Sequence, residues 1–276
     1  MRNVVVAGGT TGMGREIALH YLRQGARVTV IGSTPERGRA FLADAAGLAG
    51  EAGFVAADLM SIAENRRVIA DVESRHEALD ALVLTAMLPF LKRRETVDGL
   101  EATFVLYYLS RFLLSYGLTG LLERGETPII TNIGATGITK GAVQWDDLQS
   151  TRKYSVVRTI LSGGRANDLL PIHYLQNHPD GRTKYFGVQP PFTRSGTNHL
   201  PQPFRTITRA LGAVLAKSPA ESVRDTLAVM DAQPTERLIL RAVGTPVDPA
   251  LPTFDPANAR RLYELTAPLI AESLRG

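Results

Sequence analysis

Several residue types are scarce in this chain of 276 residues, and each scarcity removes a class of function. There is no cysteine, which excludes a disulfide framework, a thiolate metal site and a cysteine nucleophile. The five histidines stand apart, without the spacing of metal ligands. The longest apolar stretch, residues 113–122, is too short and too polar to cross a bilayer. We therefore predict no metal site and no membrane partner.

The chain also has only a small excess of positive over negative charge. Lysine and arginine together number 31 against 27 aspartates and glutamates, a net charge of +4. The densest basic run, residues 92–94, is interpreted as a solvated turn rather than an anion site. No basic stripe is interleaved with aromatic residues, so no nucleic-acid partner is predicted. The chain enters a strand without a secretory leader, and a cytoplasmic protein is the expectation.

What is present is an alternation of short apolar runs with helical patterns. The runs are continuously apolar, as buried parallel strands require. The pattern predicts one doubly wound α/β (Rossmann) domain over residues 1–276, with a parallel sheet of about seven strands and helices on both faces. The expected strands are residues 3–7, 27–31, 53–57, 81–85, 128–133, 184–188 and 237–240. The expected helices are residues 13–24, 35–46, 61–77, 97–124, 153–177 and 206–231.

Two segments depart from this regularity. The stretch "ILSGGRANDLLPIHYLQ", residues 160–176, has helical spacing but carries Gly163 and Gly164 near its middle. Each interior glycine costs a helix about 1 kcal/mol relative to alanine. The segment 189–205 holds four prolines and little periodicity, which is typical of a functional loop such as a substrate lid. Its candidate pocket residues are apolar or aromatic: Phe192, His199, Leu200 and Phe204.

A glycine-rich turn follows the first predicted strand, in "VVVAGGTTGMGREIA" at residues 4–18. Gly8, Gly12 and Gly14 let the chain turn sharply, approach a pyrophosphate and pack the next helix on the sheet. The helix N-terminus offers N–H donors to an anion. The alternative is a glycine-rich turn without a ligand; its place after the first strand favours dinucleotide binding.

The spacing of these glycines resembles that of the short-chain dehydrogenase/reductase superfamily, with Ala7 where the family usually has threonine. The likeness covers nearly the whole chain and is greatest to the retinol-dehydrogenase-like branch. Three further segments carry it: "TVDGLEATFVLYYLSRFLL" (96–114), "AVQWDDLQSTRKYS" (142–155) and "RRLYELTAPL" (260–269). The resemblance implies a nicotinamide cofactor and hydride transfer.

The end of the second strand favours NADP(H) over NAD(H). No acidic residue is present there to bind the ribose hydroxyls of NAD, whereas Ser33, Thr34 and Arg37 suit a 2′-phosphate. Ser33 or Thr34 could also cap the next helix. Asp58 matches the family residue at the adenine, or caps the helix after it. The predicted cofactor site comprises Gly8, Thr10, Thr11, Gly12, Met13, Gly14, Ser33, Thr34, Arg37, Asp58, Leu59, Thr85 and Ala86.

All four catalytic positions of the family are substituted when its motifs are carried over without gaps. The family's Tyr falls on Ile160, its Lys on Gly164, its Ser on Ala135 and its Asn on Tyr107. Met87 replaces a glycine beside the cofactor. The resemblance thus implies that the usual acid–base mechanism is absent, and that the dinucleotide binds more weakly than is normal for the family or does not bind.

Two residues are candidates for a replacement catalytic role. Tyr107 occupies a position that points at the site in the family, with Arg111 one turn on, although a space-filling aromatic is the favoured interpretation. Thr136 offers a hydroxyl next to Ala135. Tyr154 and Arg158 form a Tyr-x-x-x-Arg motif for which a surface or lid role is preferred. Asp168 is expected to be solvated or capped rather than a buried acid.

Three functions remain open at this point. The first is an atypical NADP(H) oxidoreductase acting on a lipophilic carbonyl or enone. The second is a repurposed isomerase, cyclase or dehydratase, and the third a non-catalytic dinucleotide-binding sensor. The expected partner is a small lipophilic molecule. The resemblance also implies a homodimer or homotetramer built through residues 97–124 and 153–177.

Overall fold

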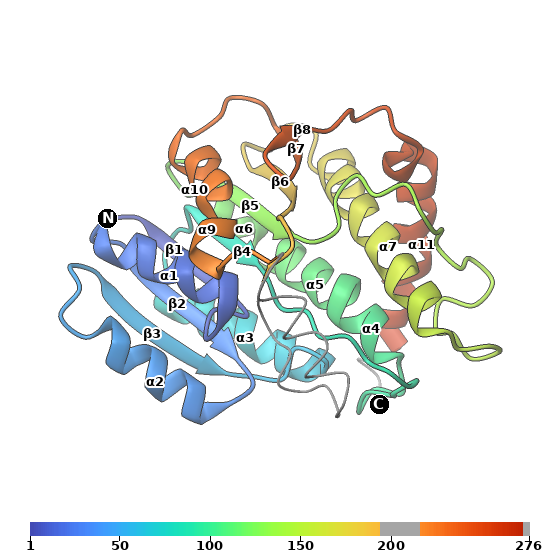
Figure 1. Cartoon of the computed structure of the whole chain (residues 1–276), viewed down its shortest axis with the longest axis horizontal. Coiled ribbons are helices and arrows are strands. Elements are labelled where there is room, and N and C mark those ends of the chain that lie inside the picture. Colours follow the sequence, from blue (N-terminus) through green and yellow to red (C-terminus); the bar gives the residue numbers. More distant parts are fainter. Residues whose placement is uncertain (194–215, 273–276) are drawn as a thin grey trace.

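The structure, a computed structural model, describes residues 1–193 and 216–272. It is a sheet between two layers of helices, which confirms the predicted doubly wound α/β fold (Figure 1). The strands are β1 (Asn3–Ala7), β2 (Arg27–Gly32), β3 (Glu51–Ala56), β4 (Ala81–Leu84), β5 (Ile129–Ile133), β6 (Lys184–Gln189), β7 (Leu238–Ala242) and β8 (Thr245–Pro246).

The strand order is β3-β2-β1-β4-β5-β6-β7-β8, and every pair is parallel except β7 with β8. The sheet therefore has eight strands where about seven were predicted. The extra strand is two exposed residues after a turn at Gly244, too short to leave a periodic signal. The strand order reverses at β1, which lies between β2 and β4. In such sheets the crevice beyond the carboxyl ends at this point holds the ligand.

The helices pack on both faces of the sheet. Their bounds are α1 (Gly12–Arg23), α2 (Pro35–Ala45), α3 (Ile62–Arg75), α4 (Ala102–Phe104), the π-helix η1 (Val105–Leu109), α5 (Ser110–Gly117), α6 (Thr119–Glu123), α7 (Val156–Asn177), α9 (Pro219–Ser222), α10 (Arg224–Asp231), the 3₁₀ helix η3 (Pro252–Phe254) and α11 (Pro256–Glu272). Among these described helices, none combines the length and apolar character that a membrane span needs.

The prediction of one long helix over residues 97–124 is wrong, because the helix begins later and is interrupted. Residues 96–100 form a turn in which Thr96 Oγ1 accepts hydrogen bonds from the amides of Asp98 and Leu100. The Glu101 carboxylate then accepts from the Phe104 amide at 2.7 Å and starts the helix there. The chain passes through one π-helical segment and breaks at Leu118, between α5 and α6.

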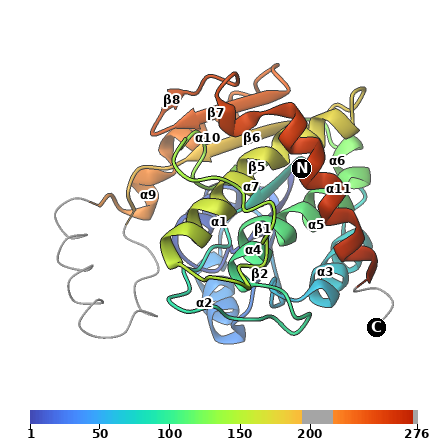
Figure 2. The same cartoon turned by 90° about the vertical axis from the view of Figure 1, so that its right-hand side faces the viewer.

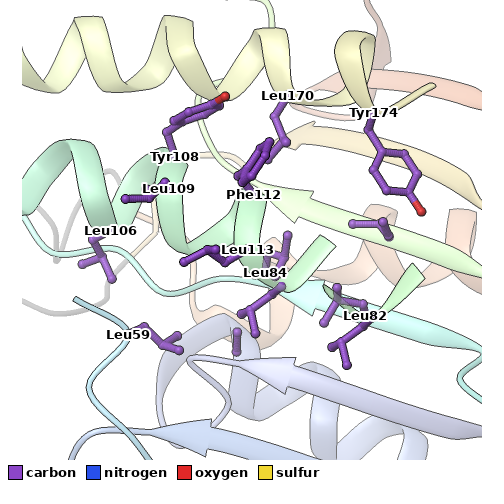
Figure 3. Packing of buried hydrophobic residues seen from close by; sticks show 14 of the residues in the cluster. Leu59, Leu82, Leu84, Leu106, Tyr108, Leu109, Phe112, Leu113, Leu170 and Tyr174 are labelled. Atoms are coloured by element: carbon purple, nitrogen blue, oxygen red, sulfur yellow. The ribbon is translucent and has the colours of Figure 1, made fainter. Parts of the chain in front are cut away.

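Two apolar clusters lie on the two faces of the sheet because successive strand residues point to opposite sides. In β1, Val5 and Ala7 face α3, α5 and α7, whereas Val4 and Val6 face α1, α2 and α10. Figure 3 shows the first cluster, in which side chains of η1 and α5 pack between β4 and α7. This packing fixes the helices that carry the candidate catalytic positions.

The C-terminal helix α11 lies on the outer side of α5 and α7 (Figure 2). The ring of Tyr263 is 5.9 Å from that of Phe112 and 5.6 Å from that of His173, centroid to centroid. The α5–α7 face, by which the resemblance predicts subunit contact, is thus partly covered by the chain itself.

Three sequence predictions lie partly outside the described residues. Residues 189–193 of the predicted lid are described, and Phe192 is exposed there. His199, Leu200 and Phe204 are not among the described residues. Of the helix predicted over 206–231, the described part forms α9 and α10, which meet at Val223.

Candidate functional site

The glycine-rich turn between β1 and α1 is packed so closely that side chains do not fit. Gly8 has φ +83°, and a Cβ on it would lie 2.7 Å from Thr85 Oγ1. A Cβ on Gly14 would lie 2.5 Å from the Gly8 carbonyl oxygen. Thr85 fastens this turn to the end of β4, because its hydroxyl donates to the Ala7 oxygen at 2.9 Å. Thr85 therefore shapes the turn.

The N-terminus of α1 is free of side-chain capping. Thr11 occupies the N-cap position, but its exposed side chain accepts no hydrogen bond from the helix. The first amides of α1 therefore keep their capacity to bind an anion. Thr10 is buried against Gly32, and Met13 receives a contact from the Thr193 hydroxyl at 3.8 Å. The uncapped amides at the start of α1 are the donors that an anion such as a pyrophosphate requires.

The end of β2 presents unused polar groups. Ser33 is exposed. Thr34 is the N-cap residue of α2, as one alternative from the sequence predicts, but its side chain makes no cap hydrogen bond. Arg37 is exposed on the first turn of α2. The only acidic residue of that turn, Glu36, is paired with Arg39 at 2.8 Å. A phosphate at this position would meet hydroxyls and a cation.

Asp58 and Leu59 follow β3 at the same edge. Asp58 is exposed, and its Oδ1 accepts from the Met60 amide at 3.0 Å. It does not cap α3, because Ser61 accepts from the Glu64 amide and Asp98 from the Ile62 amide. Leu59 is buried in the core. A pocket of about 290 Å³ lies beside Asp58, between the start of α3 and residues 94–97.

The candidate catalytic positions come together where α7 passes η1 and the segment after β5. A Cβ on Gly164 would lie 3.7 Å from the Ala135 Cβ, with no other neighbour within 4 Å. A Cβ on Gly163 would lie 3.3 Å from Tyr107 Cβ. Ile160, one turn earlier, is half-buried and packs on the core. Gly163 thus brings the helix backbone close to the ring of Tyr107, whereas Gly164 faces Ala135.

Only one of the two candidate hydroxyls lies near these glycines. Thr136 faces β6, where a Cβ on Gly187 would lie 3.2 Å from Thr136 Oγ1. Tyr107 lies against Gly163 and is 4% exposed. Burial raises the pKa of Tyr107 to about 12, with Arg111 opposing the rise. The phenol is therefore neutral at physiological pH and is a hydrogen-bond donor.

A buried guanidinium lies beneath this region. Arg111 donates to Asn132 Oδ1, to the Ile133 oxygen at 2.7 Å and to the Ala86 oxygen at 3.1 Å. Burial lowers the pKa of Arg111 to about 10, so it stays charged near neutrality. No carboxylate of the described residues pairs with it. Arg111 thereby holds the carboxyl ends of β4 and β5 beside the site.

The polar network around Arg111 extends into α7 and β6. Asn132 Nδ2 donates to Asn167 Oδ1 at 2.9 Å and to Tyr185 Oη at 3.3 Å. Sequence reasoning paired Arg111 with Tyr107 and overlooked Asn132 and Tyr185. A polar residue inside an apolar strand, as in "IITNI", was the available signal.

Asp168 is buried and ion-paired, which corrects the expectation of a solvated or capped carboxylate. Its Oδ2 accepts from Arg165 Nη2 and from the Thr253 hydroxyl, both at 2.7 Å. Arg165 also donates to the Ala135 oxygen at 2.9 Å. Burial raises the pKa of Asp168 to about 7. The pair ties the segment after β5 to α7 and η3.

Tyr154 lies before α7 and not within it, because the helix starts at Val156 rather than at residue 153. Its hydroxyl donates to the Phe90 oxygen at 2.8 Å. The motif with Arg158 is therefore not one helical turn. This position is compatible with the surface role predicted for Tyr154.

The comparisons with known proteins agree with this architecture. Residues 2–145 match the family model described as short chain dehydrogenase. A candidate daunorubicin C-13 ketoreductase of a Streptomyces strain is 30% identical over 99% of this chain and 94% of its own length. Mouse retinol dehydrogenase 14 is 24% identical over 98% of this chain and 86% of its own.

A solved structure shares the fold at low identity. It is a short chain dehydrogenase from Burkholderia cenocepacia in complex with NADP, with a TM-score of 0.66 and 17% identity. The match covers 88% of this chain and 96% of that one. Together with the family match and the relative aligned along nearly its whole length, the turn, the sheet order and the helix arrangement place this chain in the short-chain dehydrogenase family.

Proposed function

We propose that this protein is an NADP(H)-dependent oxidoreductase that acts on a lipophilic carbonyl or enone without the usual Tyr–Lys pair. The observation that carries the proposal is the side-chain-free cradle at Gly8 and Gly14, packed on Thr85 at an uncapped helix N-terminus. The names of the two relatives, a ketoreductase and a retinol dehydrogenase, support redox chemistry on apolar substrates.

The residues at the sheet edge fit the adenosine and pyrophosphate part of such a cofactor. The amides at the start of α1 would bind the pyrophosphate, and Ser33 and Arg37 the 2′-phosphate. Asp58 and Leu59 lie where the adenine would be held. When bound, the nicotinamide supplies the hydride. The NADP held by the Burkholderia structure supports this choice of cofactor.

The protein's own contribution near the substrate oxygen would be a hydrogen bond from a neutral phenol. Ala135, Ile160 and Gly164 have no side-chain group that donates a proton. Tyr107 lies against Gly163, and its phenol is protonated at neutral pH, so it would donate a hydrogen bond to a carbonyl oxygen and polarise it. A pKa near 12 makes it a weak general acid, and a missing acid–base group costs about 10²–10⁴-fold in rate. We therefore expect slow turnover, or a substrate that is already activated.

Cofactor choice is tested by titration calorimetry with NADPH and NADH. We expect NADPH to bind more tightly than NADH, and Arg37→Ala to weaken NADPH about tenfold while leaving NADH unchanged. Arg39→Ala is the matched control, because Arg39 is on the same helix but is paired with Glu36. If neither NADPH nor NADH binds, the proposal is contradicted.

Turnover is tested by following NADPH absorbance with polycyclic ketones, retinal-like aldehydes and enones. We expect consumption with at least one apolar class, reduced at least tenfold by Tyr107→Phe, which keeps the ring that fills the space beside Gly163. Tight NADPH binding with no consumption across the panel contradicts the redox proposal and leaves the non-redox and sensor functions.

A further inference from the structure

Two surface segments, residues 87–94 and 152–158, lie beside each other next to the end of β4. Tyr154 Oη donates to the Phe90 oxygen at 2.8 Å, and Arg93 Nε donates to the Gln149 oxygen at 3.1 Å. These contacts bring the loop after β4 alongside the segment that leads into α7. We call the two segments together the basic–apolar surface.

Large aliphatic side chains of this surface point into solvent. Leu88 is 41% exposed, Leu91 49% and Val157 68%. Met87, at the start of the first segment, is exposed as well. Single exposed apolar residues are ordinary, but a group of them on adjoining segments marks an interaction site.

The same segments are strongly positive. Residues 87–94 and 152–158 contain no aspartate or glutamate. Their exposed cations are Lys92, Arg94, Arg152, Lys153 and Arg158. None of these five forms a salt bridge with a described residue, whereas Arg93 is paired with Glu95. Arg152 lies near the carboxylate of Asp147, which accepts from its amide at 3.1 Å, and the other four cations add to the positive charge of the surface.

We propose that the basic–apolar surface docks on an anionic lipid membrane. Cations attracted to acidic headgroups, with aliphatic side chains that enter the acyl boundary, are the two components of peripheral binding. A nucleic acid fits less well, because Phe90 and Tyr154 are half-buried and offer no exposed stacking platform. An acidic protein surface without apolar side chains would leave the leucines exposed to solvent.

This proposal departs from the sequence analysis, which predicts no membrane partner and a solvated turn at residues 92–94. That prediction rests on the lack of an apolar stretch long enough to cross a bilayer, and docking on a membrane surface requires no such stretch. The docking proposal does not rest on the proposed function. Met87 directly follows Ala86, which packs on the glycine turn, so docking would turn the edge of the candidate site toward the lipid.

Vesicle sedimentation tests the proposal with the full chain. Vesicles of phosphatidylcholine alone are compared with vesicles that contain phosphatidylglycerol, at low and high salt. We expect binding to the anionic vesicles only, weakened by salt. Each basic residue near an anionic surface contributes about fivefold to partitioning, so Lys92→Glu with Arg94→Glu is expected to lower it at least about 25-fold. Leu88→Ser with Leu91→Ser is expected to lower it about tenfold.

The matched control is Arg23→Glu with Arg224→Glu, which makes the same charge change on α1 and α10, on the other face of the sheet. We expect it to bind vesicles nearly as wild type does, and thermal melting to report all variants as folded. Equal losses for both charge-reversal pairs would overturn the proposal in favour of unspecific attraction. Unchanged vesicle binding by the leucine variant would point instead to a polyanionic ligand without lipid. The absence of binding to anionic vesicles at low salt would also refute the membrane proposal.

Discussion

At the residue scale, Gly163 and Gly164 are adjacent but have different surroundings. A Cβ on Gly164 meets only ordinary contact with Ala135 at 3.7 Å, whereas one on Gly163 meets Tyr107 at 3.3 Å. We expect Gly164→Ala to stabilise the protein by about 0.5–1 kcal/mol, from helix propensity. Gly163→Ala is expected to stabilise the protein less, or to destabilise it, because the side chain of Tyr107 must shift. Urea unfolding measures both, and equal gains would contradict this account of the pair.

The surroundings of Gly164 also permit a direct test of the proposal that the usual Tyr–Lys pair is absent. Ile160→Tyr with Gly164→Lys introduces the residues that the resemblance assigns to these positions, and a Cβ on Gly164 meets only ordinary contact with Ala135. If the scaffold still presents a nicotinamide to this position, we expect NADPH-dependent reduction of simple ketones to rise about 10²-fold or more. Ile160→Phe with Gly164→Gln matches the size without a proton donor or charge. No rise above that control would mean that the cofactor is held differently.

At the element scale, the strands were predictable because buried parallel strands are continuously apolar, as "NVVVA" in β1 is. The break in the helix predicted over residues 97–124 was not predictable from the sequence. Thr96 turns the chain and Glu101 caps the new helix through side-chain bonds that periodicity does not reveal. In the site, the glycine spacing identified the cradle, but the bond of Arg111 to Asn132 joins residues 21 apart in sequence. Contacts between residues that are far apart in sequence depend on how the elements pack, and the local sequence pattern does not reveal them.

The packing of α5, α7 and α11 around His173 has a measurable pH dependence. Its nitrogens contact Tyr108 Oη at 3.2 Å and Tyr116 Oη at 2.8 Å, and burial lowers the pKa of His173 to about 3. Unfolded histidine titrates near pH 6.5, so between these values the unfolded state binds a proton that the native state does not. The contribution of His173 to the free energy of unfolding therefore decreases by about 2 kcal/mol when the pH falls from 7 to 5.

His173→Gln removes this titration. We expect it to be less stable than wild type at pH 7, with the difference narrowing by about 2 kcal/mol at pH 5. Denaturant unfolding at the two pH values measures this. The contribution of Asp168, whose raised pKa favours folding as pH falls, is common to both proteins and cancels. A difference that stays constant with pH would show that His173 is protonated in the folded protein.

At the scale of the whole molecule, the position of α11 bears on assembly. The resemblance predicts a homodimer or homotetramer through α5 and α7, and this assembly remains a proposal. Tyr263 of α11 packs on Phe112 and His173, and the Thr266 hydroxyl donates to Tyr108 Oη at 3.2 Å. A second subunit on the same part of this face would have to displace α11. An assembly that keeps α11 in place must use other surfaces.

The absence of cysteine makes this question accessible to single-site labelling. Thr266 is fully buried, whereas its neighbour Leu265 is 40% exposed on the same helix. We expect Thr266→Cys to react with a maleimide at least about 100-fold more slowly than Leu265→Cys, because labelling requires local opening of α11. Light scattering gives the assembly state of each variant in the same buffer. Comparable labelling rates in a dimeric protein would show that α11 leaves the α5–α7 face, and that the subunits meet there as the resemblance implies.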